Sequence, residues 1–321
     1  MGSVNIGPRP RAAMDAYYES SSRWRWRLEQ YSVKRRISSR RVVESPLPVC
    51  RFDFIMCIAA FLWQAHPLYP FFLLLNRDEY HSRPTKPLEW WECNEILGGR
   101  DGLAGGTWLA CSRNGRVAFL TNFREVELLP QAKSRGELPV RFLKSKTTPL
   151  DFAKEVEKEA HQYNGFNLII ADIPSKTMFY ITNRPINNSD SLVTEVPPGI
   201  HVLTNAQLDS PWPKALRLDQ SLREFVNKNG DRELPVKEMV EKLMTNTIKD
   251  DVSLLPGIYS PRREYQYSSI FVDTDSELGR YGTGSISALS VKNSGEASFF
   301  EKHLENDAWI DSSFTFQIEN F

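Results

Sequence analysis

Residues 56–79 read MCIAAFLWQAHPLYPFFLLLNRDE, and this stretch decides the fold. It contains two apolar runs, at residues 57–63 and 70–75, whose length and aromatic content predict strands. The proline-containing segment after His66 predicts the turn between them. Two strands joined in this way pair antiparallel, so the start of the first is expected beside the end of the second.

The predicted pairing brings Cys57 close to the guanidinium of Arg77 and the carboxylate of Asp78. A nearby cation lowers the pKa of a thiol and increases the fraction of reactive thiolate. A carboxylate can orient an adjacent amine or a bound substrate. The spacing also fits a structural role, in which Cys57 is a small core residue and the two charged residues form a turn ion pair.

The chain after residue 56 contains further short apolar runs and three helical periods. Residues 151–163, 212–228 and 234–245 have apolar side chains at helical spacing. Because the strands come in consecutive groups with the helices clustered between them, an antiparallel α+β fold is expected. The further strands are predicted at residues 117–121, 166–171, 177–182, 200–204, 269–273, 285–291, 297–300 and 314–318.

The composition is close to that of an average globular protein. The chain has 321 residues, 40 Lys and Arg against 40 Asp and Glu, and 41% hydrophobic residues. These values exclude a collagen, a coiled-coil rod and a fully disordered chain. No apolar run approaches the roughly 20 residues that span a bilayer, so no transmembrane segment is expected.

Cysteine and histidine spacing gives no metal motif. The five histidines contain no HExxH pattern, so no metal site is expected. His66, His81 and Cys93 are the only nearby candidates for haem ligation, and nothing in their spacing requires it. All four cysteines lie in the first third of the chain, which favours a reduced, intracellular protein over a disulfide framework. The four cysteines form no CxxC pair. They are Cys50, Cys57, Cys93 and Cys111.

Residues 1–55 differ from the rest and are predicted as a separate leader before a domain at residues 56–321. They carry eleven Lys and Arg against five Asp and Glu and lack the apolar run of a secretory signal peptide. Two interpretations stay open: an organellar transit segment, or a disordered leader that a later translation start omits. A basic run without an attached motif is typical of a solvated tail, so no nucleic-acid partner is expected.

Two glycine pairs, Gly98-Gly99 and Gly105-Gly106, lie on either side of Arg100 and Asp101. A phosphate-binding loop would need a GxxxxGK[ST] pattern, which the chain does not contain. Tight turns between strands are therefore the favoured interpretation of both pairs.

A series of short motifs runs in order along residues 56–321. They are Met56-Cys57-Ile58, Asn76-Arg77-Asp78-Glu79, Gly98-Gly99-Arg100-Asp101, Gly105-Gly106-Thr107-Trp108-Leu109, Thr121-Asn122-Phe123-Arg124, Ser134-Arg135-Gly136, Asn164-Gly165-Phe166-Asn167-Leu168, Leu203-Thr204-Asn205, Pro211-Trp212-Pro213-Lys214, Ser268-Ser269-Ile270-Phe271 and Tyr281-Gly282-Thr283. Their identity and order resemble the NRDE family, also called the Transport and Golgi organisation 2 family. Residues 1–55 lie outside the resemblance.

The resemblance implies an α+β fold, a four-layer αββα sandwich of the N-terminal-nucleophile hydrolase type. In such enzymes the chain begins at the nucleophilic cysteine, and two later asparagines complete the site. By position, the resemblance assigns these catalytic roles to Cys57, Arg77, Asp78, Asn122 and Asn205. The ligand-binding residues are expected to be Asn76, Glu79, Arg100 and Trp108.

The implied mechanism uses the α-amine of the cysteine as its base. An α-amine has a pKa near 7.7–8.0, so it can accept the thiol proton at neutral pH. An Asn amide can stabilise the oxyanion that follows. Cys57 is internal here, so its nitrogen is a non-basic amide until the bond after Met56 is cut. In addition, Gly284 stands where the family has an arginine; if that arginine binds an anionic ligand group, this chain is expected to bind the group more weakly.

Three functional hypotheses follow from the resemblance. The first is a trafficking factor that mobilises haem, lipid or acyl-CoA and takes part in secretory-pathway organisation. The second is a cysteine amidohydrolase that cleaves a C–N bond, and the third is a non-catalytic scaffold. No cofactor is expected to be required, although haem is a possible transported ligand. The expected compartment is the cytoplasm, with the mitochondrion, chloroplast or Golgi as alternatives.

Overall fold

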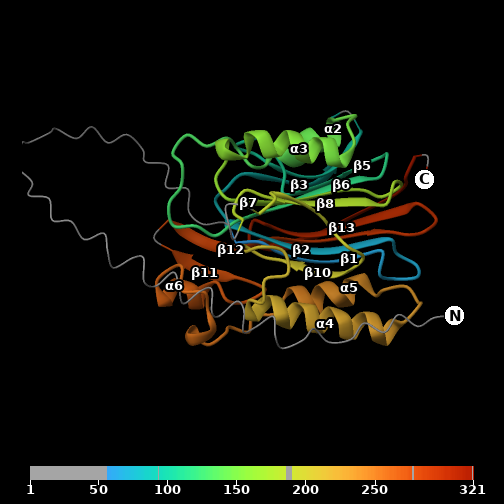
Figure 1. Cartoon of the computed structure of the whole chain (residues 1–321). Coiled ribbons are helices and arrows are strands. Elements are labelled where there is room, and N and C mark those ends of the chain that lie inside the picture. The colour runs from blue at the N-terminus through green and yellow to red at the C-terminus, as the bar shows by residue number, and fades with distance from the viewer. Residues whose placement is uncertain (1–55, 93, 186–189, 277, 320) are drawn as a thin grey trace, which may run out of the picture. The chain divides into compact units, whose positions relative to one another are not determined.

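Two antiparallel sheets packed face to face form the centre of the structure (Figure 1). This computed structural model describes residues 56–321 except 93, 186–189, 277 and 320. These residues belong to the unit Phe54–Phe321, which is distinct from the unit Met1–Asp53. The leader predicted at residues 1–55 lies outside the described residues.

The first sheet is built from strands far apart in the sequence. Its strands are β1 Ile58–Trp63, β2 Phe71–Tyr80, β10 Gly199–Leu203, β11 Asp273–Ser276, β12 Gly279–Val291, β13 Glu296–Glu305 and β14 Ala308–Gln317. Their order is β10-β1-β2-β12-β13-β14, with β11 attached to β12. As predicted, β1 and β2 pair antiparallel, with Ile58 opposite Asn76.

The second sheet is a meander in which each strand pairs with the next along the chain. Its strands are β3 Thr85–Trp90, β4 Ile96–Asp101, β5 Leu109–Ser112, β6 Arg116–Asn122, β7 Phe166–Asp172, β8 Thr177–Thr182 and β9 Val193–Glu195. The sheet turns its apolar side chains toward the first sheet on one face and toward helices on the other.

Helices cover the outer face of each sheet. They are α2 Glu137–Lys144, α3 Pro149–Glu159, α4 Pro213–Asn229, α5 Val236–Met239 and α6 Pro261–Gln266, with short helical turns η1 Ala160–Gln162, η2 Val240–Met244 and η3 Val252–Leu254. Figure 1 shows α2 and α3 over the second sheet and α4 and α5 over the first. The predicted four-layer αββα sandwich is confirmed.

The strand period of two sorts side chains into separate cores. In β6, Val117 and Phe119 enter the core between the sheets, whereas Ala118 and Leu120 face α2 and α3. Phe61 of β1 meets Phe119 edge-on, with ring centroids 5.3 Å apart. This contact joins the two sheets near the middle of their shared core.

The two glycine pairs lie in different kinds of backbone structure. Gly105 has a φ of +71° and lies in the predicted turn, but the turn predicted at Gly98 and Gly99 is wrong because both residues lie within β4. A Cβ on Gly98 would come within 2.6 Å of the Ala110 side chain, and one on Gly99 within 2.5 Å of the Trp108 ring. These glycines therefore allow close packing.

Other differences concern strand boundaries. β2 continues to Tyr80, so the Asn76–Glu79 motif lies within the strand and does not follow its end. The strand predicted at residues 269–273 begins only at Asp273. Strands β3, β4, β5 and β9 were not predicted. β3 is a polar edge strand containing Pro87, a residue that edge strands tolerate because one side of the backbone needs no partner.

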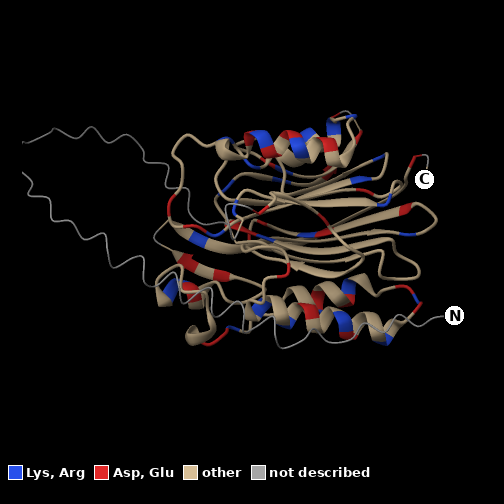
Figure 2. Cartoon of the chain, in the orientation of Figure 1, with Lys and Arg blue, Asp and Glu red and all other residues tan. Residues whose placement is uncertain are grey.

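The outer helices carry charges of both signs (Figure 2). On α4, Arg223 pairs with Asp219 one turn earlier. In the described part of the chain, no helix has the length and apolar character of a membrane span.

Replacing Phe61 by alanine should remove the aromatic contact between the sheets. Phe61 is fully buried, so Phe61→Ala is expected to lower the free energy of unfolding by about 3–5 kcal/mol. Urea denaturation of the two proteins measures this difference. Leu103→Ala, at a residue that is 66% exposed, is the control and should change stability by less than about 0.5 kcal/mol. Equal effects would contradict the assigned core.

Candidate functional site

Cys57 lies immediately before β1, the strand between β2 and β10. Extending the registers of both pairs places Arg77 on one side of Cys57 and Asn205 on the other. The Cys57 side chain is buried, and burial raises the pKa of its thiol to about 12. The nearby Asp78 charge also raises it, whereas the Asp78 backbone N–H and the Arg77 charge lower it. The expectation of a thiolate promoted by Arg77 is therefore not met in this internal position, because desolvation outweighs the cation.

Asp78 follows Arg77 in β2, and it is fully buried. Its Oδ1 accepts a hydrogen bond from the Thr283 hydroxyl at 2.7 Å. Its Oδ2 is buried with no hydrogen-bond partner among the described residues. Burial raises the pKa of this carboxyl, while the neighbouring Lys214 charge and the Thr283 hydrogen bond lower it.

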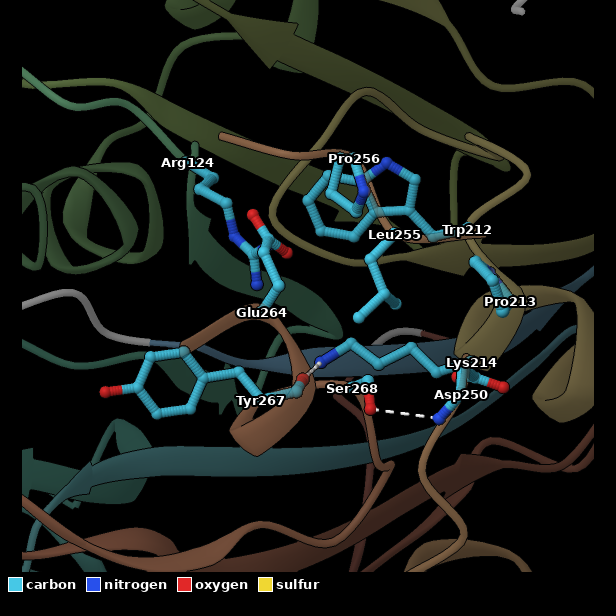
Figure 3. A pocket seen from close by; sticks show the side chains of 10 residues that line it. All are labelled: Arg124, Trp212, Pro213, Lys214, Asp250, Leu255, Pro256, Glu264, Tyr267 and Ser268. Carbon is cyan, nitrogen blue, oxygen red and sulfur yellow. Dashed lines mark hydrogen bonds and ion pairs between the residues drawn. The ribbon is translucent and has the colours of Figure 1, made fainter. Parts of the chain in front are cut away.

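Lys214 is a buried cation near this carboxylate that the sequence analysis did not assign to the site. It lies in the first turn of α4, and its Nζ donates to the Tyr267 carbonyl at 3.1 Å (Figure 3). Burial lowers the pKa of the Lys214 amine, and the Asp78 and Cys57 charges raise it. The signal in the sequence was a lysine spaced at helical intervals from Leu218 and Leu222, on the apolar face of the helix.

Arg124 and Glu264 form a buried ion pair beside Lys214 (Figure 3). Their side chains approach to 2.6 Å, and the Arg124 guanidinium lies 4.7 Å from the Trp212 ring centroid. A second nitrogen of Arg124 donates to the sulfur of Met56 at 3.2 Å. The cavity that these side chains line with Lys214 is about 10 Å³, which is room for one water.

The two asparagines assigned by resemblance are joined by a hydrogen bond from the side chain of one to the backbone of the other. Asn122 ends β6, and Asn205 follows β10. The Asn205 side-chain amide donates to the Asn122 carbonyl at 2.9 Å, and the Arg124 N–H donates to the Asn205 carbonyl at 2.7 Å. Both asparagines are buried. These bonds hold the ends of strands from opposite sheets side by side.

A cleft of about 410 Å³ lies on the other side of Arg77. The Arg77 guanidinium stacks over the Trp108 ring at 4.3 Å from its centroid, and both residues line the cleft. Glu79 lies 4.0 Å from Arg77 and 3.4 Å from Arg83. Arg77, Glu79 and Trp108, three residues of the predicted site, therefore share one surface.

Asn76 and Arg100 occupy other places. The Asn76 amide donates to the carbonyls of Met244 and Ile270, so it ties β2 to the segments behind the sheet. Arg100 pairs with Glu92 at 2.9 Å and lies over the Trp91 ring, and it is not among the residues lining the cleft. Their predicted ligand-binding roles stay untested.

Gly284, which replaces the family arginine, lies at the irregularity between Thr283 and Ser285 in β12 and lines the cleft. A Cβ built on it would meet nothing within 4 Å. The missing arginine therefore leaves open space at this wall of the cleft.

The candidate haem ligands are spread apart. His66 packs against Tyr69, whereas His81 and His303 line the cleft. Cys93 lies outside the described residues. Over the ranges that the structure covers, no group of three or more His, Cys, Asp or Glu side chains is arranged to hold a metal ion.

Comparison with known families gives a match over most of the described residues. The model of the Transport and Golgi organisation 2 family matches residues 56–306. The chain belongs to this family. This family member is 33% identical to the Transport and Golgi organization protein 2 homolog of Bos taurus and 32% identical to that of Homo sapiens. Each match covers 83% of this chain and 100% of the relative. The resemblance expected from the motifs is confirmed.

Two solved structures are similar in outline to this family member. A conjugated bile acid hydrolase of Clostridium perfringens has a TM-score of 0.44 and 9% identity, over 81% of this chain and 97% of that chain. An N-acylethanolamine-hydrolyzing acid amidase ortholog of Caenorhabditis elegans has a TM-score of 0.34 and 15% identity, over 66% and 97%. At these scores the likeness does not extend to chemistry.

Glu301 gives the cleft a measurable pH dependence. It is buried and accepts a hydrogen bond from the Leu88 N–H at 2.7 Å. Burial raises the pKa of Glu301 from 4.5 to about 7, although the Leu88 N–H and the Arg77 charge lower it. Because the folded state holds this proton more tightly than the unfolded state, the native chain should lose stability as the pH rises from about 4.5 to 7.

Glu301→Gln keeps an acceptor for Leu88 but carries no charge. Above pH 7 this variant should be more stable than the native chain by up to about 3 kcal/mol, and the difference should vanish near pH 4.5. Urea denaturation at pH 5 and pH 8 measures it. The exposed cleft residue Glu305, changed to glutamine, is the matched control. A pH-independent effect of Glu301→Gln would contradict the assignment.

Proposed function

We propose that this protein binds a small molecule with an acidic group, such as acyl-CoA or haem, and moves it within the cell. The observation that carries this proposal is the cleft in which Arg77 lies against Trp108. Its volume is within the range of small-molecule sites, which combine an apolar wall with a few placed polar groups. Membership of the Transport and Golgi organisation 2 family agrees with an intracellular trafficking role.

The charges of the cleft favour one orientation of such a ligand. Arg77 is 7% exposed, so an anionic group bound to it would be largely removed from water and held more strongly than at the surface. Glu79 already has two cationic neighbours, Arg77 and Arg83. Glu301 is partly protonated near neutral pH, because its pKa is about 7. The acidic group is therefore expected at Arg77, with an apolar part of the ligand along Trp108.

Titration of the full chain with palmitoyl-CoA and, separately, with haem should give saturable binding. Arg77→Gln is expected to weaken binding about tenfold or more, because a charge-assisted contact is lost. Arg100→Gln is the matched control, since Arg100 also stacks on a tryptophan but lies outside the cleft. Saturation transfer or calorimetry measures the affinity of each variant for each ligand. If neither ligand binds, or if the two variants lose affinity equally, this function is rejected.

A second function, cysteine amidohydrolase, is favoured by the unpartnered Oδ2 of Asp78. Buried polar atoms usually have partners, so an orphan carboxylate oxygen indicates a missing group. In a chain that begins at Cys57, the α-ammonium would stand beside this carboxylate. Its neutral form would then provide the base that the amide nitrogen cannot.

Iodoacetamide should distinguish the two forms of the chain. In residues 1–321 the thiol of Cys57, with a pKa of about 12, should stay unlabelled at pH 7.5 for hours. In residues 57–321 Cys57 should be labelled at least about tenfold faster, because an adjacent ammonium favours the thiolate. Peptide mass spectrometry gives the rate at each site, and the buried Cys111 is the internal control. Identical rates at Cys57 in both forms would remove support for the hydrolase.

A further inference from the structure

Met56, the residue before Cys57, has a pocket of its own. Its side chain is 1% exposed and packs with Tyr267, Val272 and Tyr281, with Tyr80 against the same cluster. This cluster is distinct from the core between the sheets and from the core under α2 and α3. Met56 is thus bound by a small set of side chains at the end of the fold where Cys57 lies.

Polar side chains hold both ends of Met56. Its backbone N–H donates to the Tyr281 hydroxyl at 2.6 Å, and its sulfur accepts from Arg124 at 3.2 Å. A thioether is a weak acceptor for a buried guanidinium. The Nε of Arg124 is buried and has no hydrogen-bond partner within the described residues, although another nitrogen pairs with Glu264. Arg124 therefore has donor capacity that Met56 does not use well.

A chain that begins at Cys57 leaves this space vacant. The Tyr281 hydroxyl and the Arg124 guanidinium would then face a pocket with aromatic walls. Apolar walls with a few convergent polar groups are the usual composition of a small-molecule site. The residues around Met56 are also not among those that line the cleft, apart from Tyr80.

We propose that this pocket is an occluded binding site, filled by Met56 in the uncut chain and open to an N-acylated amino acid with an unbranched side chain when the chain begins at Cys57. Such a ligand repeats each contact of Met56. Its N–H donates to Tyr281, its side chain lies among the tyrosines with an acceptor toward Arg124, and its carboxylate faces the new α-ammonium of Cys57. The proposal shares with the hydrolase function the requirement for a chain that begins at Cys57, but it concerns binding and requires no turnover.

The test uses residues 57–321 and N-acetyl-L-methionine as the probe. The mammalian relatives are matched over their whole length by 83% of this chain, so this domain is expected to fold without the leader. Isothermal titration calorimetry should show saturable binding to residues 57–321 that is at least tenfold weaker, or absent, with the full chain. N-acetyl-L-valine should bind at least tenfold more weakly than the methionine probe, because its branched side chain is shorter and wider.

Two tyrosine variants locate the binding. Tyr281→Phe removes the oxygen that accepts the N–H and should weaken binding of the probe five- to tenfold. Tyr80→Phe is the matched control, because its hydroxyl lies 3.5 Å from Ser276 and is not bonded to Met56. Equal binding by the full chain and residues 57–321, no binding by a folded 57–321, or equal losses in the two variants would overturn the proposal.

A second variant covers the case in which residues 57–321 do not fold. Met56→Gly in the full chain empties the same space without cutting the backbone, and ethyl methyl sulfide is then the probe. A thermal shift with this variant that the native chain does not show supports the pocket, and its absence overturns it. Iodoacetamide labelling of Cys57 distinguishes the binding site from the hydrolase function. Probe binding without labelling supports the binding site and rejects the hydrolase. Labelling without probe binding supports the hydrolase and rejects the binding site.

Discussion

The burial of the Asp78 carboxylate is the constraint on which the centre of this structure depends. It lies on β2, where β12 supplies the Thr283 hydroxyl and α4 supplies the Lys214 amine as a nearby cation. Removing a carboxylate from water is costly unless hydrogen bonds and opposite charges compensate. Only one of its oxygens is bonded among the described residues, so the compensation is incomplete. A buried carboxylate oxygen without a hydrogen-bond partner is typical of a site that binds an additional donor group.

Arg77 connects the two regions that the structure defines. One is the buried surroundings of Cys57, and the other is the cleft along Trp108. Because successive side chains of a strand point to opposite faces, Arg77 and Asp78 serve different sides of the same sheet. Arg77 lies opposite Cys57 in the extended register and therefore shares its face of the sheet, whereas Asp78 points to the other face, toward Lys214 of α4.

The fold was largely predictable because its strongest signals are local. The β1–β2 pairing followed from two apolar runs and a turn, and the helices of the middle segment followed from their periodicity. The edge strand β3 was not predictable, because its side chains are mostly exposed and polar. Within the site, the proximity of Cys57 to its neighbours on β2 was predicted from the strand pairing. Lys214 did not, because a lysine near a helix start is usually solvated, and only tertiary packing shows that it is buried.

The different connectivity of the two sheets has a consequence for how the chain folds. Each strand of the second sheet pairs with its neighbour in sequence, and all of these pairs except β6–β7, which α2 and α3 separate, need little loop closure. β2, in contrast, pairs with β12, where Asn76 lies opposite Ile286. During synthesis the meander is expected to form while β2 still has one bare edge. A chain that ends before β12 would keep that edge, which makes early termination an aggregation hazard as well as a loss of sequence.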